Sequence, residues 1–361
     1  MPSLKSDELS YTHKECEIYK IFGKKIKLIC HDAELRPYIF GELNLYPKTD
    51  EADLTVEIVE KKDISKSLTH FEQNSIVEIP TKLSYSYFIF DGEKLVHILF
   101  SLKKPINTLH EWIQKFRNME FNHRQERVGQ IIHEQVLVPS VFFDEYRVPI
   151  HSSAVQYNGQ VILFGGHGGV GKTSLELELC FNNDATFIAD DMSVVSNSGV
   201  YPNLNFPKLY GYNVEGNLEI KERVISKRNK IDWLQWNYQK MKGADKVRRR
   251  ISPAELYKNY HMDEQPIDRY VILKRCDNNE VQISKLSVNE ATEVTIGILQ
   301  SEFRSIFKVF GTECKNVILN RWEEKLPQIF SRINCEEVSI PEKMSHKKFK
   351  ETMIELFINR I

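Results

Sequence analysis

The residues best suited to chemistry lie between positions 151 and 195 of this 361-residue chain. Within them, residues 166–173 read Gly-His-Gly-Gly-Val-Gly-Lys-Thr, which matches the phosphate-binding loop pattern G-x-x-x-x-G-K-[ST] in full. Glycines let backbone N–H groups approach a triphosphate closely, and a following helix adds its free N–H groups and positive dipole end. We therefore expect a nucleotide to bind at Gly166, His167, Gly168, Gly169, Val170, Gly171, Lys172, Thr173 and Ser174.

Two features of the surrounding residues fit the same chemistry. Lys172 supplies a positive charge for the β- and γ-phosphate oxygens, and Thr173 supplies a hydroxyl for Mg²⁺. A short apolar run at 185–189 then stops on Asp190-Asp191, so a strand end brings carboxylates to the metal side. We predict that Asp190 holds Mg²⁺ through water. The expected cofactors are ATP and Mg²⁺; because the loop binds phosphates and not the base, GTP and pyrophosphate stay open as alternatives to ATP.

The elements that must position these residues can be predicted from local patterns. Apolar runs at 153–157 and 160–164 are joined by Asn158-Gly159, which is the strongest short hairpin signal because both turn residues need positive φ. Adjacent strand residues point to opposite faces, so both aspartates reach one site only if the strand end turns. The alternatives are that one aspartate caps a helix or turn, or that the two exchange roles.

Length and composition limit the other possibilities. A chain of 361 residues favours two domains, which we place at 1–125 and 126–361. The formal net charge of −1 gives no global field toward nucleic acid or an anionic membrane. Six scattered cysteines without a C-x-x-C pair are typical of reduced thiols in a cytoplasmic protein. The chain has no uncharged apolar run long enough to span a bilayer, so we expect no membrane partner.

The first 125 residues look β-rich and carry no chemical motif. Strands are predicted at 18–22, 25–30, 52–59, 83–90 and 94–100, the last two as a hairpin around Asp91-Gly92. Helical spacing follows at 106–121 and 124–138, and the second helix has one apolar face made by Val128, Ile131, Ile132 and Val136. We expect that second helix to pack beside the strand at 153–157. The N-terminal domain is interpreted as a contact for substrate, a partner or the second domain.

The remainder reads as the rest of an α/β nucleotide-binding domain. A loop segment follows the aspartates, with a short hairpin around 197–199. A strand at 269–273 is expected to pair with one at 281–286, and a last strand lies at 337–340. Helices are predicted at 289–310, 317–330 and 345–360.

Residues 217–260 mix basic and aromatic side chains and leave three interpretations open. One is a nucleic-acid surface, which the neutral net charge disfavours. Another is a solvated helical face with Trp233 and Trp236 packed as a pair. The third is an anion-handling segment in which one arginine reaches the transferred phosphoryl group. The candidates for that arginine are Arg228, Arg248, Arg249 and Arg250.

The combination of His151, the loop at 166–173 and Ala189-Asp190-Asp191 resembles the HPr kinase/phosphorylase family over about 45 residues. That family has a histidine-initiated strand, a turn, a second strand, the phosphate-binding loop and an Ala-Asp-Asp strand end. The resemblance implies an α/β (α+β) P-loop kinase core of the HPr kinase and phosphoenolpyruvate carboxykinase type, here with a β-rich N-terminal domain. The family's glycine-rich signature after the aspartates is replaced by residues 205–210, so the chain looks closer to divergent HPr-kinase-like proteins, some of which phosphorylate a serine hydroxyl of a peptide.

The resemblance also implies roles for residues of this chain. Asp191 is the candidate base for the acceptor hydroxyl, and His151 is expected near the γ-phosphate and acceptor. The acceptor is then a serine or other hydroxyl of a peptide, protein or small molecule, and the family's oligomers suggest a homo-oligomer. Two other functions stay open from the residues: a P-loop NTPase that hydrolyses nucleotide to drive conformational change or assembly, and a nucleotide-binding regulatory protein with little turnover.

Overall fold

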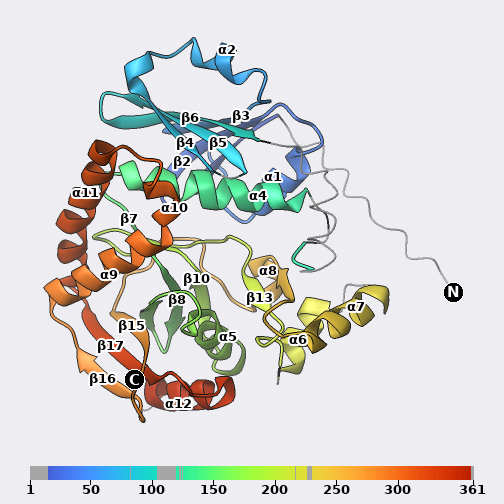
Figure 1. Ribbon diagram of the computed structural model, residues 1–361, viewed down its shortest axis with the longest axis vertical. Helices are drawn as coiled ribbons and strands as arrows, with labels where there is room; N and C mark the ends of the chain where they lie inside the picture. The colour runs from blue at the N-terminus through green and yellow to red at the C-terminus, as the bar shows by residue number, and fades with distance from the viewer. Residues whose placement is uncertain are drawn as a thin grey trace.

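The structure is a computed structural model that describes residues 15–81, 83–103, 119–121, 123, 125–215, 217–225 and 230–358. It has a mixed α/β architecture with two six-stranded mixed sheets, one in each half of the chain (Figure 1). The α/β class is therefore as predicted. The two large sheets are joined by helices and by two small sheets. The residues of the predicted site belong to the second half of the chain.

The N-terminal sheet has the strand order β1-β2-β3-β6-β5-β4. Five of its strands were predicted, whereas β4 and two helices, α1 (Arg36–Leu43) and α2 (Ile64–Leu68), were not. Helix α1 starts with proline at its first turn and shows no clear apolar stripe, so periodicity does not reveal it. The strands are β1 (Cys16–Ile21), β2 (Lys24–Cys30), β3 (Leu54–Ile58), β4 (Ile76–Pro80), β5 (Ser84–Asp91) and β6 (Lys94–Leu102), with a 3₁₀ turn at Gln73–Ser75.

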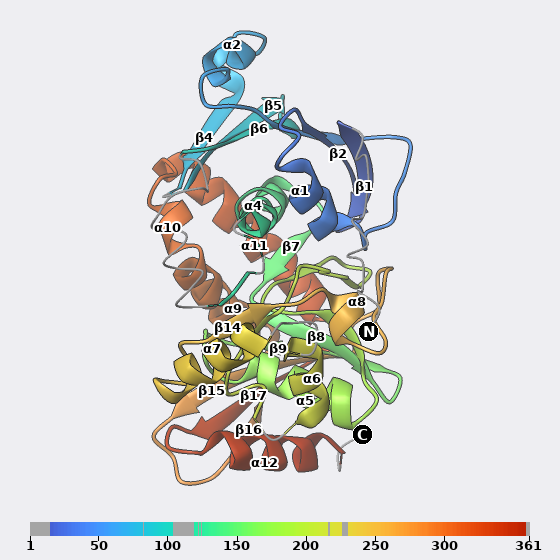
Figure 2. The ribbon, with the colours of Figure 1, turned by 90° about the vertical axis from the view of Figure 1, so that its right-hand side faces the viewer.

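Helix α4 (Glu126–Ile132) lies with α1 beneath this sheet (Figure 2). It continues into a π-helical turn at His133–Leu137 and a 3₁₀ turn at Pro139–Phe143, where proline ends the regular helix. The four residues predicted to form its apolar face are buried. The expected packing beside the strand at 153–157 is wrong, because α4 packs on α1 so closely that a Cβ on Gly129 would lie 2.8 Å from Glu42. The helix predicted at 106–121 lies mostly outside the described residues.

The second sheet has the order β10-β8-β9-β15-β17-β16. The predicted hairpin forms β8 (Ser152–Tyr157) and β9 (Gln160–Gly165), and its turn residues Asn158 and Gly159 have φ of 48° and 79°. Strand β16 (Gln282–Lys285) pairs antiparallel with β17 (Asn334–Pro341), so its predicted pairing with β15 (Arg269–Cys276) is wrong. Strand β15 instead lies parallel between β9 and β17.

Helices cover both faces of the second sheet because its central strands are apolar on both sides. On β9, Ile162 and Phe164 face one apolar cluster and Val161 and Leu163 face another. The first cluster is closed by α5 (Lys172–Asn182) and α12 (His346–Ile358). The second contains α9 (Val288–Glu302), α10 (Arg304–Phe307) and α11 (Thr312–Phe330), and it continues without a break into the core under the N-terminal sheet.

Smaller elements connect the two halves. The predicted hairpin around 197–199 forms β11 (Ser193–Val195) and β12 (Val200–Tyr201), which join β7 (Val148–Ile150) in a three-stranded sheet. Strands β13 (Lys208–Tyr210) and β14 (Arg248–Arg250) pair with each other. Helices α6 (Leu218–Ile225), α7 (Lys230–Met241) and α8 (Pro253–Leu256) lie nearby. On α7, Trp236 is buried while Trp233 is exposed, so the two tryptophans do not form the packed pair that was expected.

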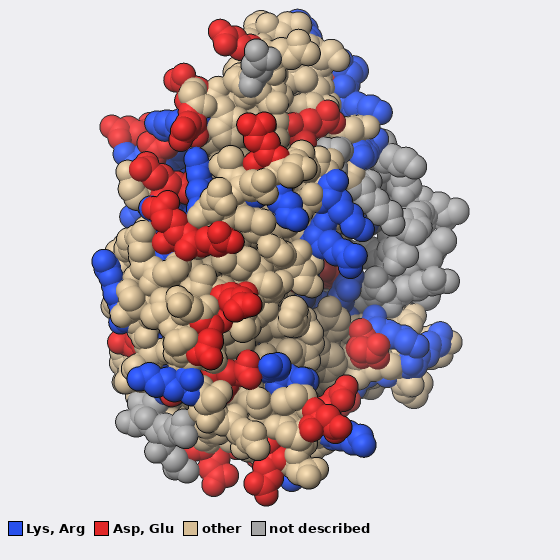
Figure 3. All heavy atoms as spheres, turned by 60° about the vertical axis from the view of Figure 1, so that its left-hand side comes forward, with Lys and Arg blue, Asp and Glu red and all other residues tan. Residues whose placement is uncertain are grey.

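The surface shows both signs of charge. Acidic and basic side chains are spread over the face drawn in Figure 3, in keeping with the formal net charge of −1. No helix within the described ranges is both long and apolar enough to cross a membrane. The division at residue 125 stays a prediction.

Candidate functional site

The loop at 166–171 leaves β9 and leads into α5, as predicted. Gly166, Gly169 and Gly171 have φ of 138°, 81° and 116°, which side-chain-bearing residues rarely adopt. A Cβ on Gly166 would lie 2.5 Å from the carbonyl oxygen of Leu273, and one on Gly171 would lie 2.6 Å from the Phe349 ring. The backbone therefore needs glycine at these positions, and the loop keeps the open form that a phosphate group requires.

Lys172 opens α5 and folds back over the loop. Its Nζ donates to the carbonyl oxygens of Gly166 (2.9 Å) and His167 (3.1 Å). Burial lowers the pKa of Lys172, although the nearby carboxylates of Asp191, Asp190 and Glu302 oppose this effect. The ammonium group is thus held at the loop by weak neutral acceptors, which phosphate oxygens can replace.

Thr173 and Asp190 come together as predicted. The Thr173 hydroxyl donates to Oδ1 of Asp190 (2.8 Å), and the Ser153 hydroxyl donates to the same oxygen (3.1 Å). Burial and the charge of Asp191 raise the pKa of Asp190, and the two hydroxyl hydrogen bonds limit the rise. A hydroxyl beside a carboxylate is the hard-oxygen donor set that suits Mg²⁺, so these residues fit the expected metal. Ser153 was not predicted to take part in the site, although it lies on β8, the strand that pairs with β10.

The chain turns at Asp190-Asp191, directly after β10 (Thr186–Ala189). Asp191 has φ of 65°, and the Met192 N–H closes the turn on the Asp190 carbonyl oxygen (2.7 Å). The Asp190 carboxylate accepts from Thr173 on the loop helix, and both aspartates line a cavity. This turn is the condition under which both aspartates serve one site.

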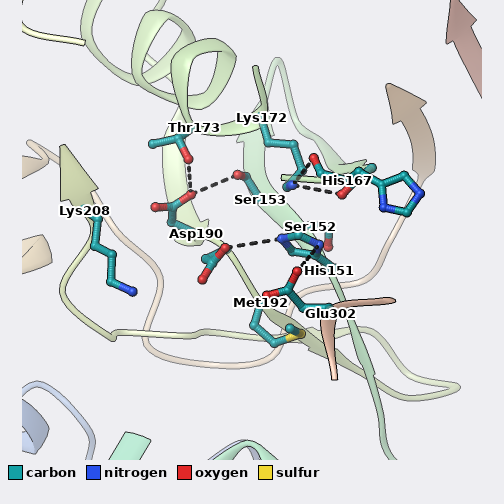
Figure 4. Close-up of polar contacts among 12 residues, drawn as sticks. His151, Ser152, Ser153, His167, Lys172, Thr173, Asp190, Met192, Lys208 and Glu302 are labelled. Carbon is teal, nitrogen blue, oxygen red and sulfur yellow. Dashed lines mark hydrogen bonds and ion pairs between the residues drawn. The ribbon is translucent and has the colours of Figure 1, made fainter. Parts of the chain in front are cut away.

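His151 holds the second aspartate. Its side chain is only 3% exposed, its Nε2 lies 3.3 Å from Oδ1 of Asp191, and its Nδ1 lies 3.5 Å from Oε2 of Glu302 (Figure 4). Loss of hydration would raise the pKa of the Asp191 carboxylate. The hydrogen bond with His151 and the charges of Lys208 and Lys172 outweigh this effect, so the pKa of Asp191 is lowered. Glu302, which reaches the site from the C-terminal end of α9, was not predicted from the sequence.

A cavity of about 390 Å³ opens beside the two aspartates. One wall is the π-helical turn that contains His133 and Glu134, and another is the junction between α9 and α10. Lys208 projects into it from β13 and donates to Oε1 of Glu134 (2.6 Å). Burial would lower the pKa of Lys208, but the carboxylates of Glu134 and Asp191 raise it. A stable cation therefore lies beside the aspartates.

The proposed arginines are not in that position. Arg248 pairs with Glu120 (2.6 Å) and Arg249 donates to the Met119 carbonyl oxygen, while the buried Arg250 pairs with the equally buried Glu42. Each of these guanidinium groups is engaged in structural contacts, which disfavours the interpretation that one of the three reaches the phosphoryl group. Arg228 lies outside the described residues.

Three other predicted residues, His167, Ser174 and Val170, lie in or directly after the loop and do not contact the aspartates. The His167 ring is exposed and directed away from the aspartates, and only its carbonyl oxygen contacts Lys172 (Figure 4). The Ser174 hydroxyl accepts from Nδ2 of Asn213 (3.0 Å) and contacts Nε2 of His346 (2.9 Å), so it ties α5 to neighbouring segments. Val170 is buried in the apolar cluster under the loop.

Comparison with known proteins adds one observation. No family model and no curated protein matches the chain. Among solved structures, the chain is similar to the Hpr(Ser) kinase/phosphatase from Coxiella burnetii, with 10% identity and a TM-score of 0.22, over 58% of this chain and 98% of that chain. At that TM-score the likeness carries no argument of its own, so the interpretation of the site rests on its own residues.

Proposed function

We propose that this protein is an ATP- and Mg²⁺-dependent kinase that phosphorylates a serine or other hydroxyl group. The proposal is carried by one observation: a phosphate-binding loop, a Thr173–Asp190 pair and an Asp191–His151 pair meet beside a cavity. It makes the chain a divergent relative of the HPr-kinase-like proteins, with residues 126–361 as the catalytic part. Binding of nucleotide alone does not need a second carboxylate held by a histidine.

The chain's residues divide the work. The loop N–H groups and Lys172 hold the β- and γ-phosphates, and Thr173 and Asp190 hold the metal. Bound there, Mg²⁺ supplies charge neutralisation at the phosphate oxygens. Lys208 takes the position that the arginines do not fill and stabilises negative charge on the transferred group. This arrangement supplies positioning and electrostatics, which phosphoryl transfer chiefly needs.

Asp191 receives the proton of the acceptor. The acceptor oxygen forms a bond to the γ-phosphorus, the bond from that phosphorus to the β-phosphate oxygen breaks, and ADP leaves with the electron pair. The hydroxyl proton moves to the Asp191 carboxylate. Its lowered pKa keeps this carboxylate ionised at neutral pH, and His151 holds it in place.

Nucleotide hydrolysis is the second candidate. Glu134 and Glu302 line the same cavity, so a carboxylate is available to orient an attacking water in place of the acceptor. The two functions differ in where the γ-phosphoryl group ends: on an acceptor or in free phosphate.

The test uses γ-labelled ATP and Mg²⁺ with a panel of hydroxyl compounds and peptides. Asp191→Asn should lower acceptor labelling about 10²- to 10⁴-fold while keeping nucleotide binding, because only the base is lost. Lys172→Ala should lose nucleotide binding, and the exposed Asp277→Asn serves as the matched control. Full transfer by Asp191→Asn would show that the base is misassigned. Steady release of free phosphate with no labelled acceptor would favour hydrolysis.

A further inference from the structure

The cavity beside Asp191 carries a distinctive set of charges, and the inference drawn from them rests on the proposed function. The Glu134 carboxylate is paired with Lys208 at 2.6 Å, so Glu134 already has a counter-charge. Asp190 is turned toward Thr173 and Ser153, on the metal side. The carboxylates left to face an acceptor are therefore Asp191 and Glu302, whose side chains are 59% and 44% exposed.

Glu302 lacks a strong partner. Nδ1 of His151 lies 3.5 Å from its Oε2 but makes no hydrogen bond, and across the described ranges no lysine or arginine forms an ion pair with Glu302. Of the two carboxylates beside His151, only Asp191 is hydrogen-bonded to the ring. Lys172 acts on Glu302 electrostatically but forms no ion pair with it, so the Glu302 carboxylate has room for a ligand.

A second observation points to a ligand in the same cavity. His133 lines it, is 1% exposed, and has no hydrogen-bond partner for Nδ1, although its Nε2 contacts the Tyr46 hydroxyl (3.2 Å). Burial and the charges of Arg250 and Lys208 lower the pKa of His133 to about 3, so the ring is neutral at pH 7. Unpaired buried polar atoms are rare, and a π-helical turn such as the one that carries His133 is frequent at functional sites.

The distance between the Asp191 and Glu302 carboxylates is limited by the histidine that lies between them. They contact opposite nitrogens of one imidazole ring, so they are separated by no more than that ring and the two contact distances of 3.3 and 3.5 Å. A small molecule can therefore place one group on each. Apolar side chains of Met192, Phe303 and Ile306 complete the wall and suit a short carbon skeleton.

We propose that this cavity is the acceptor site and that it selects an amino alcohol unit, with the hydroxyl at Asp191 and a protonated amine at Glu302. The amine satisfies the unpaired carboxylate, whereas an anionic acceptor would meet two carboxylates and the γ-phosphate. The same unit occurs in free amino alcohols, in amino sugars and at the N-terminal serine or threonine of a peptide. In each, the hydroxyl oxygen takes the phosphoryl group and loses its proton to Asp191, while the amine is unchanged.

The test compares matched acceptors with the full-length protein, Mg²⁺ and γ-labelled ATP. Ethanolamine is set against ethylene glycol and glycolate, glucosamine against glucose, and a serine-initiated peptide against its N-acetylated form. We expect kcat/KM to be at least about tenfold higher for the amine-bearing member of each productive pair. The productive pair identifies whether the source is a free compound or a peptide.

Glu302→Gln then removes the charge with little change in shape. The ratio of kcat/KM between amine-bearing and neutral acceptors should collapse by about 10- to 100-fold, because a charge-assisted hydrogen bond is lost. Glu293→Gln, an exposed glutamate on the same helix, should leave the ratio unchanged. An equal fall for every acceptor would overturn the proposal, because Glu302 would then act only through His151.

Binding separates this inference from the proposed function. With Mg²⁺ and a non-hydrolysable ATP analogue, calorimetry should show ethanolamine or glucosamine binding that Glu302→Gln weakens about 10-fold or more. Glu302-dependent amine binding without labelled product would support the site and reject the kinase. Preferred labelling of neutral or anionic acceptors would reject the site and keep the kinase. Absence of both labelling and amine binding would reject both.

Discussion

Replacing Glu42 with glutamine should destabilise the whole protein by about 3–5 kcal/mol. Glu42 on α1 and Arg250 on β14 are 3% and 5% exposed and form a two-pronged pair, with Nη1 to Oε2 at 3.1 Å. The same glutamate accepts the Phe206 N–H (3.3 Å), while Asn205 is the other partner of Arg250 (2.6 Å). Glutamine keeps the shape but leaves a buried guanidinium without a counter-charge, which is the costly way to break such a pair.

Replacing both partners should cost less. In the double variant Glu42→Leu/Arg250→Met no buried charge of the pair remains. The free energy of unfolding should then fall by only about 1–2 kcal/mol, because the Phe206 N–H and Asn205 lose hydrogen-bond partners. Glu219→Gln, which breaks the exposed α6 pair with Arg223, should cost less than about 1 kcal/mol. With about 2.1 cal/mol/K of unfolding entropy per residue, the loss from Glu42→Gln lowers Tm by about 4–7 °C.

Urea unfolding at pH 7, followed by circular dichroism, measures these values, and thermal melts check them. A Glu42→Gln variant within 1 kcal/mol of the wild type would refute the reasoning. So would a double variant less stable than the single one. Either result would mean that the pair is solvated in solution, and that Arg250 is free for another role.

Three further predictions concern the site. Gly171→Ala should abolish nucleotide binding in a fluorescent-ATP titration, because φ is 116° and the new Cβ would lie 2.6 Å from the Phe349 ring. The control Gly297→Ala, with no atom within 4 Å of its new Cβ, should bind normally. Normal binding by both variants would contradict the loop geometry. His133 has a folded pKa of about 3 against 6.5 when unfolded, so its stabilisation is complete above pH 6.5 and is lost as pH falls toward 3; between pH 7 and pH 5 the wild type should lose about 2 kcal/mol more than His133→Gln in urea melts, and equal losses would mean the ring is not buried neutral. Lys208→Met should slow phosphoryl transfer about 10²- to 10³-fold in the labelled-ATP assay, and a change below twofold would remove Lys208 from the mechanism.

The parts of the fold that follow from local pattern were predictable from the sequence. The Asn158-Gly159 turn needs two positive φ values, and the loop glycines need conformations that other residues avoid, so both leave a signature over a few residues. The apolar face of α4 is likewise visible at helical spacing. The confirmed strands, the loop and the Thr173–Asp190 contact all belong to this group.

The rest depended on contacts between distant segments. Glu302 reaches His151 only because α9 ends over the start of β8, and Lys208 enters the cavity only because β13 pairs with β14. The charge run at 248–250 left its interpretation open for the same reason, because the buried acidic partners of Arg248 and Arg250 come from distant segments. The partner of α4 could not be predicted from local pattern either, because an apolar helix face can pack against either sheet.

The turn at Asp191 has a consequence for how this protein can change over generations. A φ of 65° is tolerated by glycine, asparagine and aspartate far better than by other residues, so the backbone alone narrows the choice at this position. Asparagine is one nucleotide away from aspartate in the genetic code and has nearly the same shape. Under the proposed function, a single mutation can therefore give a descendant that folds and binds nucleotide but transfers phosphate about 10²- to 10⁴-fold more slowly. Sequence variants with Asn at this position are then the place to look for proteins that bind nucleotide with little turnover.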